Sequence, residues 1–463
     1  MAKYKAYPEY KDSEHNFVRT IPKHWGKSTV GAISSVIDPQ PDHRAPVICD
    51  DGSGYPYIGI RDVNKDGTLN FETARPVEES AVIKQEKNFI IRPHDIIFCK
   101  VGTLGLPRKI IPNGRCALSA TLVLIKADET INSQFLLYTL DSDIVVSQTN
   151  YLATGSTRAA LGIQQIRKFQ IPIPSSVEQQ QIAVFLDYET AKIDNLIEKQ
   201  QQLIELLKEK RQAVISHAVT KGLNPDVPMK DSGVDWLGEV PEHWTIAQLK
   251  FNTLEMQTGP FGSQLHAEDY VIDGIPLINP AHMNAGMIIP DPKVTVDEAT
   301  QERLGRHKLS EGEIILSRRG ELGRCAVVKK NNEGWLCGTG SLKAKLTKKI
   351  IPDYAYTLIS SEGVVSELTL ESKGSTMANL NTETLGRVRL PIPPISEQEA
   401  ILDYIKIISD KYDYLIRSAD TAIRLMQERR TALISAAVTG KIDVRDWVAP
   451  DTQDVEEPQE ATA

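Results

Sequence analysis

Two long segments of the chain carry apolar residues at a seven-residue spacing. The first begins near Glu178 and the second near Glu397, and each keeps two mainly apolar rows over about five heptads. This pattern predicts coiled-coil packing through Ile182, Leu186, Ile193, Leu196, Leu203, Leu207, Val214, Ile401, Ile405, Ile408, Tyr412, Leu415, Met426 and Leu433. A helix of roughly 40 residues is about 60 Å long, which exceeds the core of a domain of this size. We therefore predict that the two helices pair with each other. The alternative is that two amphipathic helices lie on separate cores.

The two segments belong to a longer internal repeat. Glu178 and Glu397 are 219 positions apart, and the same offset relates Trp25 to Trp244. Each tryptophan ends a Pro-x-His-Trp motif, in which we expect proline to set a turn and tryptophan to pack at the start of a globular body. The repeat predicts two globular domains at 1–174 and 223–393, two long helices at 175–222 and 394–442, and an acidic, disordered tail at 443–463.

Short apolar runs, broken by glycine, proline and aspartate, fill both globular regions. They predict strands of a multidomain α/β or α+β fold at 57–60, 96–98, 122–125, 277–278, 314–316 and 342–346. In both regions an acidic residue and two isoleucines precede basic residues and a Gly-x-x-Gly sequence, which predicts a strand that ends in a tight turn. We expect the turns to bring Lys100, Arg318 and Arg319 to the surface. Elsewhere the two regions share little sequence.

Proline-rich segments connect each globular region to its long helix. These segments are Ile171-Pro172-Ile173-Pro174 and Leu390-Pro391-Ile392-Pro393-Pro394. Because proline cannot continue a strand ladder or occupy a helix interior, we expect rigid junctions. We also expect two capping boxes at the helix starts, Ser176 with Gln179 and Ser396 with Glu399.

The composition is that of a soluble protein and leaves a nucleic-acid partner possible. The net charge is −8, but the last residues from Asp446 onward hold six acidic and no basic residues, so the remainder carries only −2. Five cysteines without CxxC spacing predict reduced thiols in a cytoplasmic protein, and cysteine and histidine spacing predicts no metal site. No apolar run has the length of a membrane span or the form of a signal peptide.

The ordered, doubled set of motifs resembles the specificity subunit of type I restriction–modification systems. The likeness rests on the Pro-hydrophobic-Pro segments that lead into Glu178-Gln179 and Glu397-Gln398, on Gly-Ser-Thr at 155–157 and 374–376, and on Ala437-Val438-Thr439-Gly440-Lys441. The first copy departs from the family pattern, because Lys221-Gly222 is inverted and Lys23 replaces the glutamate of Pro-Glu-His-Trp.

The resemblance implies a non-catalytic subunit whose two target-recognition domains each read one half of a bipartite site in double-stranded DNA. The antiparallel helices would then set the spacer and dock the partners. Those partners are two methyltransferase subunits and two restriction subunits, on which S-adenosylmethionine, ATP and Mg²⁺ are expected; this chain would hold no cofactor. Because the two globular regions differ, the predicted target is asymmetric.

Basic and amide side chains of the globular regions are the candidates for DNA contact. Arginine can read guanine edges, and both basic residue types hold phosphates. The candidates are Arg61, Lys65, Lys100, Arg108, Lys109, Arg115 and Arg158 in the first region, and Asn279, His282, Arg318, Arg319, Arg324, Lys343 and Lys345 in the second.

Two other functions stay open at this stage. A two-headed coiled-coil adaptor for proteins, without DNA binding, would have the same helices. A metal-dependent nuclease would use Pro352-Asp353 with Glu371-Ser372-Lys373, a short pattern that is frequent by chance. A methyltransferase is disfavoured, because Asn279-Pro280-Ala281-His282 lacks the second proline and the aromatic residue of that enzyme motif.

Overall fold

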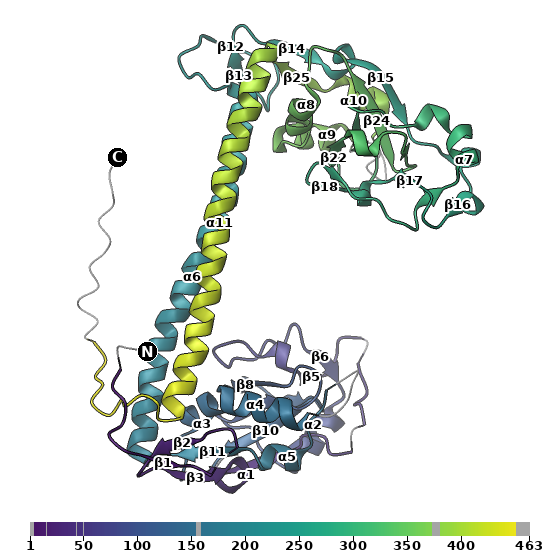
Figure 1. Cartoon of the computed structure of the whole chain (residues 1–463). Helices are drawn as coiled ribbons and strands as arrows, with labels where there is room; N and C mark the ends of the chain where they lie inside the picture. Colours follow the sequence, from purple (N-terminus) through teal and green to yellow (C-terminus); the bar gives the residue numbers. More distant parts are fainter. Residues whose placement is uncertain are drawn as a thin grey trace. The chain divides into compact units, whose positions relative to one another are not determined.

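The computed structural model describes residues 4–14, 16–42, 44–49, 51–153, 159–372 and 380–450. The chain divides into two compact units, which we call unit 1 (residues 1–202 with 420–463) and unit 2 (residues 203–419). Two long helices, α6 (Ser176–Lys221) and α11 (Ile395–Val438), each contribute one part to unit 1 and the other part to unit 2 (Figure 1). At 46 and 44 residues, they confirm the two long helices that the heptad pattern predicts.

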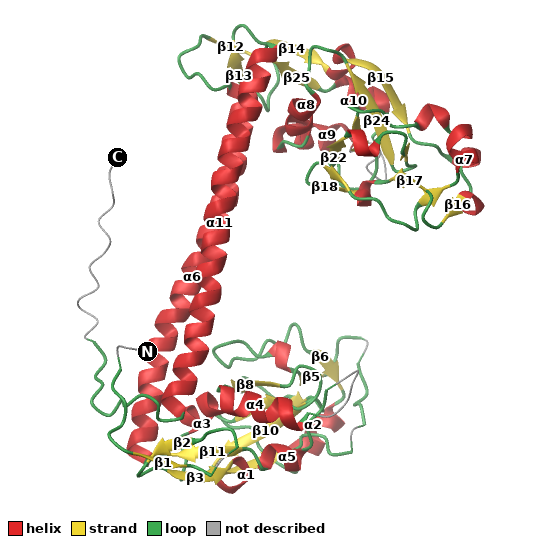
Figure 2. Cartoon of the chain, in the orientation of Figure 1, coloured by secondary structure: helices red, strands yellow, loops and turns green. Residues whose placement is uncertain are grey.

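Unit 1 combines short strands with short helices (Figure 2). Before α6 its elements are β1 (Tyr10–Asp12), β2 (Thr20–Pro22), β3 (Gly26–Thr29), α1 (Val30–Ile33), β4 (Ser34–Ile37), β5 (Tyr55–Ile58), η1 (Ile60–Asp62), β6 (Arg75–Val77), α2 (Glu79–Glu86), β7 (Ile96–Cys99), β8 (Gly105–Lys109), β9 (Ala117–Leu118), β10 (Leu122–Ala127), α3 (Ser133–Leu140), α4 (Asp143–Leu152), α5 (Ile163–Arg167) and β11 (Gln170–Ile173).

Unit 2 has the same mixture of elements between the two long helices. These are β12 (Met229–Asp231), β13 (Glu239–Pro241), β14 (Thr245–Gln248), η2 (Leu249–Asn252), β15 (Thr253–Thr258), η3 (Gly262–Gln264), η4 (Ala267–Asp269), β16 (Tyr270–Val271), β17 (Ile275–Ile278), η5 (Pro280–His282), β18 (Met283–Asn284), β19 (Met287–Ile288), β20 (Thr295–Val296), α7 (Glu298–Arg303), η6 (Gly305–His307), β21 (Ile314–Ser317), β22 (Cys325–Val327), η7 (Lys330–Asn332), β23 (Leu336–Cys337), β24 (Ser341–Leu346), α8 (Pro352–Ile359), α9 (Glu362–Ser372), α10 (Thr382–Arg387) and β25 (Arg389–Ile392).

The two globular bodies share one topology although their sequences diverge. The main sheet has the strand order β4-β10-β7-β8 in unit 1 and β15-β24-β21-β22 in unit 2. In both units its central strands are buried on both faces, as a continuous apolar run requires. Each unit also has a second sheet, with the order β6-β5-β9 in unit 1 and β16-β20-β17-β23 in unit 2, and it contains one parallel pair, β5 with β9 or β17 with β23. The mixed fold class is confirmed, and the repeat extends through the globular bodies.

The heptad pattern predicts the buried contact residues of the long helices correctly near the helix ends and incorrectly near the middles of the helices. Ile182, Leu186, Ile193, Ile401 and Leu433 are buried as expected. Leu196, Leu203 and Leu415 are exposed, and Ile204 and Ala419 are buried instead. A straight helix has 3.6 residues per turn, so its buried face drifts away from a strict seven-residue repeat.

Matched ion pairs join the two long helices within each unit. In unit 1, Arg430 Nε lies 3.1 Å from Asp194 Oδ1, and in unit 2, Arg211 Nη1 lies 2.5 Å from Asp413 Oδ1. Both arginines and both aspartates are related by the 219-residue offset. The two helices therefore pair with each other in both units. The start of α6 contacts the end of α11 in unit 1, which shows that the helices run in opposite directions.

The helix starts differ from the predicted capping boxes. At α6 the cap is one residue earlier than expected, with Ser175 Oγ donating to Glu178 Oε2 at 2.9 Å. At α11 the carbonyl of Pro394 receives the N–H groups of Glu397 and Gln398, and Ser396 lies inside the helix. The proline segments also differ from the prediction, because β11 and β25 each pair with one strand, β3 or β14. Proline fits there because a two-stranded sheet leaves an edge on which no N–H is needed.

The Pro-x-His-Trp motif binds the first turn of the long helix. In unit 1 the Glu178 carboxylate accepts from His24 Nε2 at 2.9 Å and Trp25 Nε1 at 3.3 Å. In unit 2 Glu397 accepts from His243 Nε2 at 2.6 Å and Trp244 Nε1 at 2.8 Å. Both tryptophans are fully buried. The motif therefore anchors each globular body to its helix, and we call this arrangement the Glu–His–Trp anchor.

The segment after α11 packs on unit 1 for several residues. Ile442 and Val444 are buried, and Asp443 N–H donates to Lys5 O at 2.7 Å. The segment that we predicted as disordered from Asp443 is thus packed at its start, and residues 451–463 lie outside the described part of the chain. Among the described residues, no helix has the length and apolar character that crossing a bilayer requires.

Candidate nucleic-acid interface

The basic residues of the two Gly-x-x-Gly turns follow the central strands β7 and β21, as predicted. Both glycines of each turn have positive φ, which only glycine adopts readily. The backbone around Lys100 and Arg318 is the same in both units. Lys100 N–H donates to Thr121 O and Lys100 O accepts from Leu161, while Arg318 N–H donates to Gly340 O and Arg318 O accepts from Leu380, each at 2.8 Å.

Lys100 is buried, which corrects the prediction that its turn brings it to the surface for contact with DNA. Its Nζ lies 2.5 Å from Asp38 Oδ2, and this carboxylate is itself largely covered. A buried charge requires a partner of opposite sign, and Asp38 supplies it. The turn therefore points a lysine into the domain, where the sequence indicated a surface position.

Arg318 has the same backbone position and a different environment. The strand registers place Asp38 of unit 1 and Thr258 of unit 2 at the same point, two residues beyond Val36 and Met256. A threonine carries no charge, so the guanidinium of Arg318 has no carboxylate at that point.

The Arg318 guanidinium is partly buried and under-satisfied. Its Nε and Nη1 are inaccessible to solvent and have no hydrogen-bond partner among the described residues. The guanidinium carbon lies 5.9 Å from the centre of the exposed Phe261 ring, which is within reach of a cation–π interaction. Burial and then the neighbouring charge of Arg319 lower the pKa of Arg318. Buried N–H groups without acceptors are costly, so a ligand that offers acceptor atoms would stabilise this side chain.

Arg319 is exposed beside Arg318, and within the described residues no ion pair holds its side chain. Together with Phe261 the two arginines form a surface that we call the Arg318 cluster. It offers two positive charges and one aromatic face, which are the groups that bind phosphates and bases. The sequence predicts this cluster only in part, because nothing in the spacing links Phe261 to Arg318.

The remaining candidates in unit 1 differ in their environments. Arg61 and Lys65 are exposed and Lys109 is half-buried; none of the three pairs with another side chain in the part of the chain that the structure describes, so they remain candidates. Arg115 is bound on the surface by Glu79 at 2.6 Å and Glu86 at 2.7 Å. Arg108 is half-buried on β8 and donates to Pro107 O at 3.1 Å. Arg158 and the Gly-Ser-Thr segments at 155–157 and 374–376 lie outside the described residues.

Three of the candidates in unit 2 have structural partners. Lys343 is buried with Glu313, at 3.3 Å from Oε1, and it also donates to Lys308 O. His282 is buried and accepts the backbone N–H of Asn279 at 3.1 Å. The Asn279 side chain accepts Gly340 N–H, also at 3.1 Å. These bonds give all three residues a structural role, and contact of the three with DNA stays a prediction.

Arg324 and Lys345 are the remaining candidates for DNA contact in unit 2. Arg324 pairs with Glu321 and donates to Pro280 O, so its charge is locally compensated. Lys345 is exposed on β24, and it remains a candidate.

The acidic residue of the shared motif has a structural role. Asp95 and Glu313 are both buried just before the central strand, and each pairs with a lysine of the neighbouring strand, Lys126 or Lys343. The motif thus fixes a strand and its turn, and the residue after the strand has a different environment in each unit.

The rival nuclease pattern is divided in the structure. Asp353 lies in the first turn of α8 and pairs with Lys329 at 2.8 Å. The side chain of Glu371 and all of Lys373 lie outside the described residues. No group of three or more metal-ligating side chains occurs among those that are described.

Comparisons with known proteins agree with the repeat. The family described as "Type I restriction modification DNA specificity domain" matches residues 24–206 and 257–417. The chain is 22% identical over 405 residues to the type I restriction enzyme EcoBI specificity subunit of Escherichia coli, covering 86% of this chain and 81% of that protein. It is 23% identical to the EcoKI specificity subunit of Escherichia coli strain K12, covering 72% and 70%.

A solved structure supports the fold. A chain from a study of complex assembly and conformational transition of the type I R-M system superimposes with a TM-score of 0.63 at 16% identity, covering 91% of this chain and 99% of that chain. The doubled match of the family, on both sides of the first long helix's end, fits the two units with their shared topology. This chain therefore belongs to the family of type I restriction–modification DNA specificity proteins.

Proposed function

We propose that the chain is the DNA-specificity subunit of a type I restriction–modification complex, and that each globular body reads one half of an asymmetric, bipartite duplex site. The proposal rests on one observation: the two units share the same supporting structure and differ in a residue at their shared turn. Both units have the same Glu–His–Trp anchor and main sheet. The residue at the shared turn is a neutralised lysine in unit 1, and in unit 2 it is an arginine whose Nε and Nη1 have no hydrogen-bond partner in the described part of the chain. Two readers of this kind fit two unlike half-sites.

The catalytic steps belong to other subunits in this proposal. The resemblance to the family implies methyltransferase and restriction subunits, two of each, which would carry S-adenosylmethionine, ATP and Mg²⁺. The cytoplasm is the expected location, because the substrate is chromosomal or invading DNA. This chain contributes target choice and the frame on which the partners assemble.

The long helices are the proposed spacer and docking surface. Large apolar side chains remain exposed along both of them, among them Leu196, Leu203, Leu206, Ile407, Tyr414 and Leu425. Exposed apolar surface of this extent is typical of an interface. A partner that covers these side chains would also supply positive charge around the duplex, which the near-neutral body of this chain lacks.

Methylome sequencing tests the proposal directly. Cells that express the chain with its methyltransferase subunit should gain methylation at one asymmetric sequence made of two short defined parts and an undefined spacer of fixed length. Cells with the methyltransferase alone are the control. Methylation without sequence preference, or at a palindrome, would contradict two unlike readers.

A gel shift separates this proposal from a protein adaptor. The complex with methyltransferase should retard duplex DNA that contains the methylated sequence, and it should do so more weakly as salt rises. An adaptor without DNA binding would leave the duplex unshifted with or without the partner.

A further inference from the structure

In unit 1, two terminal segments of the chain cover the beginning of α6. The ring of Phe185 packs edge-on against Tyr4 at 5.3 Å and against Trp447 at 5.2 Å, measured between ring centres. Trp447 also contacts Tyr188 at 5.5 Å, and the Gln181 side chain donates to the Trp447 carbonyl. Phe185 is consequently 0% exposed.

Unit 2 has the same helical face without this cover. The 219-residue offset places Tyr404 at the position of Phe185 and Ile407 at the position of Tyr188. Tyr404 is 37% exposed and Ile407 is 66% exposed. Ala400 replaces Gln181, which leaves additional space beside the helix.

The difference arises from how the chain connects its parts. In unit 1 the segment after α11 and the segment before β1 are separate, so both can extend along the helix. In unit 2 a single linker, residues 222–228, joins α6 directly to β12. This one linker therefore stands in place of both terminal segments of unit 1. The linker holds Leu223 and Asp226 where unit 1 has Tyr4 and Tyr7, so it supplies neither aromatic ring.

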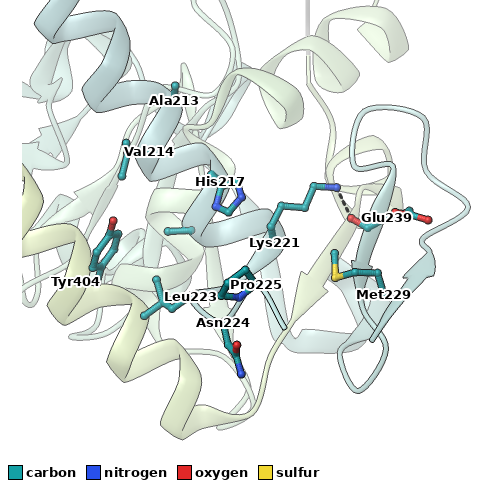
Figure 3. A pocket seen from close by; sticks show the side chains of 12 residues that line it. Ala213, Val214, His217, Lys221, Leu223, Asn224, Pro225, Met229, Glu239 and Tyr404 are labelled. Carbon is teal, nitrogen blue, oxygen red and sulfur yellow. Dashed lines mark hydrogen bonds between the residues drawn. The ribbon is translucent and has the colours of Figure 1, made fainter. Parts of the chain in front are cut away.

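A cavity of about 890 Å³ results. Figure 3 shows Tyr404 of α11 and Leu223 of the linker near the side of α6 that carries Val214 and His217. His217 is exposed here, whereas Ala436, its counterpart in unit 1, is buried. Residues that the repeat buries in one unit are therefore uncovered in the other.

A second cavity of about 250 Å³ shares Leu223 and Asn224 of the linker with the first, and it has His243, Glu397 and Ile401 in its wall. At the corresponding place in unit 1, the Tyr7 hydroxyl donates to Glu178 at 3.3 Å, next to His24 and Trp25. Unit 2 thus has two adjacent spaces where unit 1 has the aromatic side chains of Tyr4, Tyr7 and Trp447.

The far wall of the larger cavity is fixed in position. Lys221 Nζ donates to Leu237 O at 2.9 Å and to Glu239 O, so the end of α6 is tied to the hairpin of β12 and β13 (Figure 3). A site with a fixed wall needs little reordering when a ligand enters, which favours binding.

We propose that this pair of cavities binds an extended polypeptide segment that carries a tryptophan or tyrosine, supplied by the methyltransferase subunit. The partner's identity rests on the proposed function. The kind of occupant rests on unit 1, where residues 4–7 and 442–447 show what fills the same space. The chain's own residues 451–463 contain no aromatic side chain, and residues 442–447 of a second copy are already packed in that copy.

The site predicts a specific photo-crosslink. The full chain is prepared with p-benzoylphenylalanine in place of Tyr404 and assembled with the methyltransferase subunit. Illumination should link position 404 to the methyltransferase, at a peptide that contains tryptophan or tyrosine. The matched control carries the same group in place of Tyr414, an exposed tyrosine of α11 in the same unit that lines neither cavity.

A synthetic peptide with the sequence of residues 441–448 is the competitor, because it contains the segment that covers unit 1. Excess peptide should reduce the crosslink at position 404 and leave any crosslink at position 414 unchanged. Tyr404→Ser should weaken binding of the methyltransferase about 30-fold, the effect of removing an aromatic side chain that the bound segment would cover. The thermal unfolding of this variant is measured in parallel, so that a loss of folding is recognised.

Absence of a crosslink at position 404, in a complex that still methylates its bipartite sequence, would overturn this proposal and leave the proposed function intact. A crosslink to a second copy of the chain would also overturn it. If no complex with a methyltransferase forms at all, the proposed function and the assignment of the partner fail together.

Discussion

At the scale of single residues, the side chain opposite a basic group determines whether its charge is available to a ligand. Lys100 and Arg318 share one backbone position, but Asp38 neutralises the lysine, whereas the uncharged Thr258 stands opposite the arginine, for which the described residues supply no counter-ion. The Gly-x-x-Gly spacing identifies both residues but does not show which of them is neutralised. To distinguish the two residues one must know the register of β4 and β15 against their neighbouring strands, and this register cannot be read from the sequence.

Replacement of both arginines of the Arg318 cluster should weaken DNA binding. For Arg318→Ala with Arg319→Ala, each lost phosphate contact reduces the slope of log affinity against log salt by about 0.9, and a lost guanine contact costs about 1–3 kcal/mol at one base position. The measurement is a salt titration of binding to the methylated sequence and to variants at each position. Arg324→Ala is the matched control, because Glu321 already neutralises that arginine. Unchanged affinity and slope would remove the cluster from the interface.

Lys100→Ala should destabilise the protein without altering DNA choice. The substitution leaves Asp38 charged and largely buried, which costs about 3–5 kcal/mol. Unfolding by urea measures the loss, and methylome sequencing checks that the target sequence is retained. A changed half-site in a stable Lys100→Ala variant would make this residue a candidate for base contact again.

At the scale of elements, the long helices were the most predictable part of the chain, because an apolar repeat sustained over five heptads is typical of coiled-coil packing. Their contact residues drift by one position near the middle, as Leu203 and Ile204 show, since the helices follow their natural 3.6-residue period. The strands were also predicted, but not the topology that the two bodies share. That topology is maintained by burial, which many different sequences can satisfy.

The Glu–His–Trp anchor makes the stability of unit 1 depend on pH. Burial raises the pKa of Glu178, and hydrogen bonds from His24, Ser175 and Trp25 lower it further than burial raises it, so that the pKa lies below the ordinary value of 4.5. The folded protein thus binds this proton more weakly than the unfolded chain. The carboxylate's contribution to stability is fully present above about pH 4.5 and is lost as the pH falls through the lower folded-state pKa.

Glu178→Gln should therefore reduce the free energy of unfolding most at neutral pH. On acidification the difference from the unmodified chain should shrink, because the unmodified chain loses the same contribution. Glu198→Gln, an exposed change on the same helix, is the control and should show no such trend. A constant difference across this range of pH would mean that the anchor depends on shape and not on the charge of Glu178.

At the scale of the whole molecule, the repeat shows which structural features are the same in both units and which differ between them. The anchors, the central strands and the paired helices lie at matched positions in both units, and they fix each body to its helix. Residues 30–150 lie between the Trp25 side of the unit 1 anchor and α6. They can therefore be exchanged without removing His24, Trp25 or Glu178.

Exchange of residues 30–150 for those of a relative should change one half of the methylated sequence and leave the other half and the spacer unchanged. The reason is physical: the exchanged body meets the same anchor on α6, although the contacts of Asn132, Tyr138 and Asp141 with the long helices are exchanged with it. The measurement is the methylome of cells that carry the chimera, compared with cells that carry the parent chain. A chimera in which His24 and Trp25 are also replaced by alanine is the control for the anchor, and it should lose the altered half-site together with the stability of unit 1. If the first exchange changed both halves or the spacer, the two bodies would not read independently. The repeat would then describe how the chain folds and not how it chooses its target.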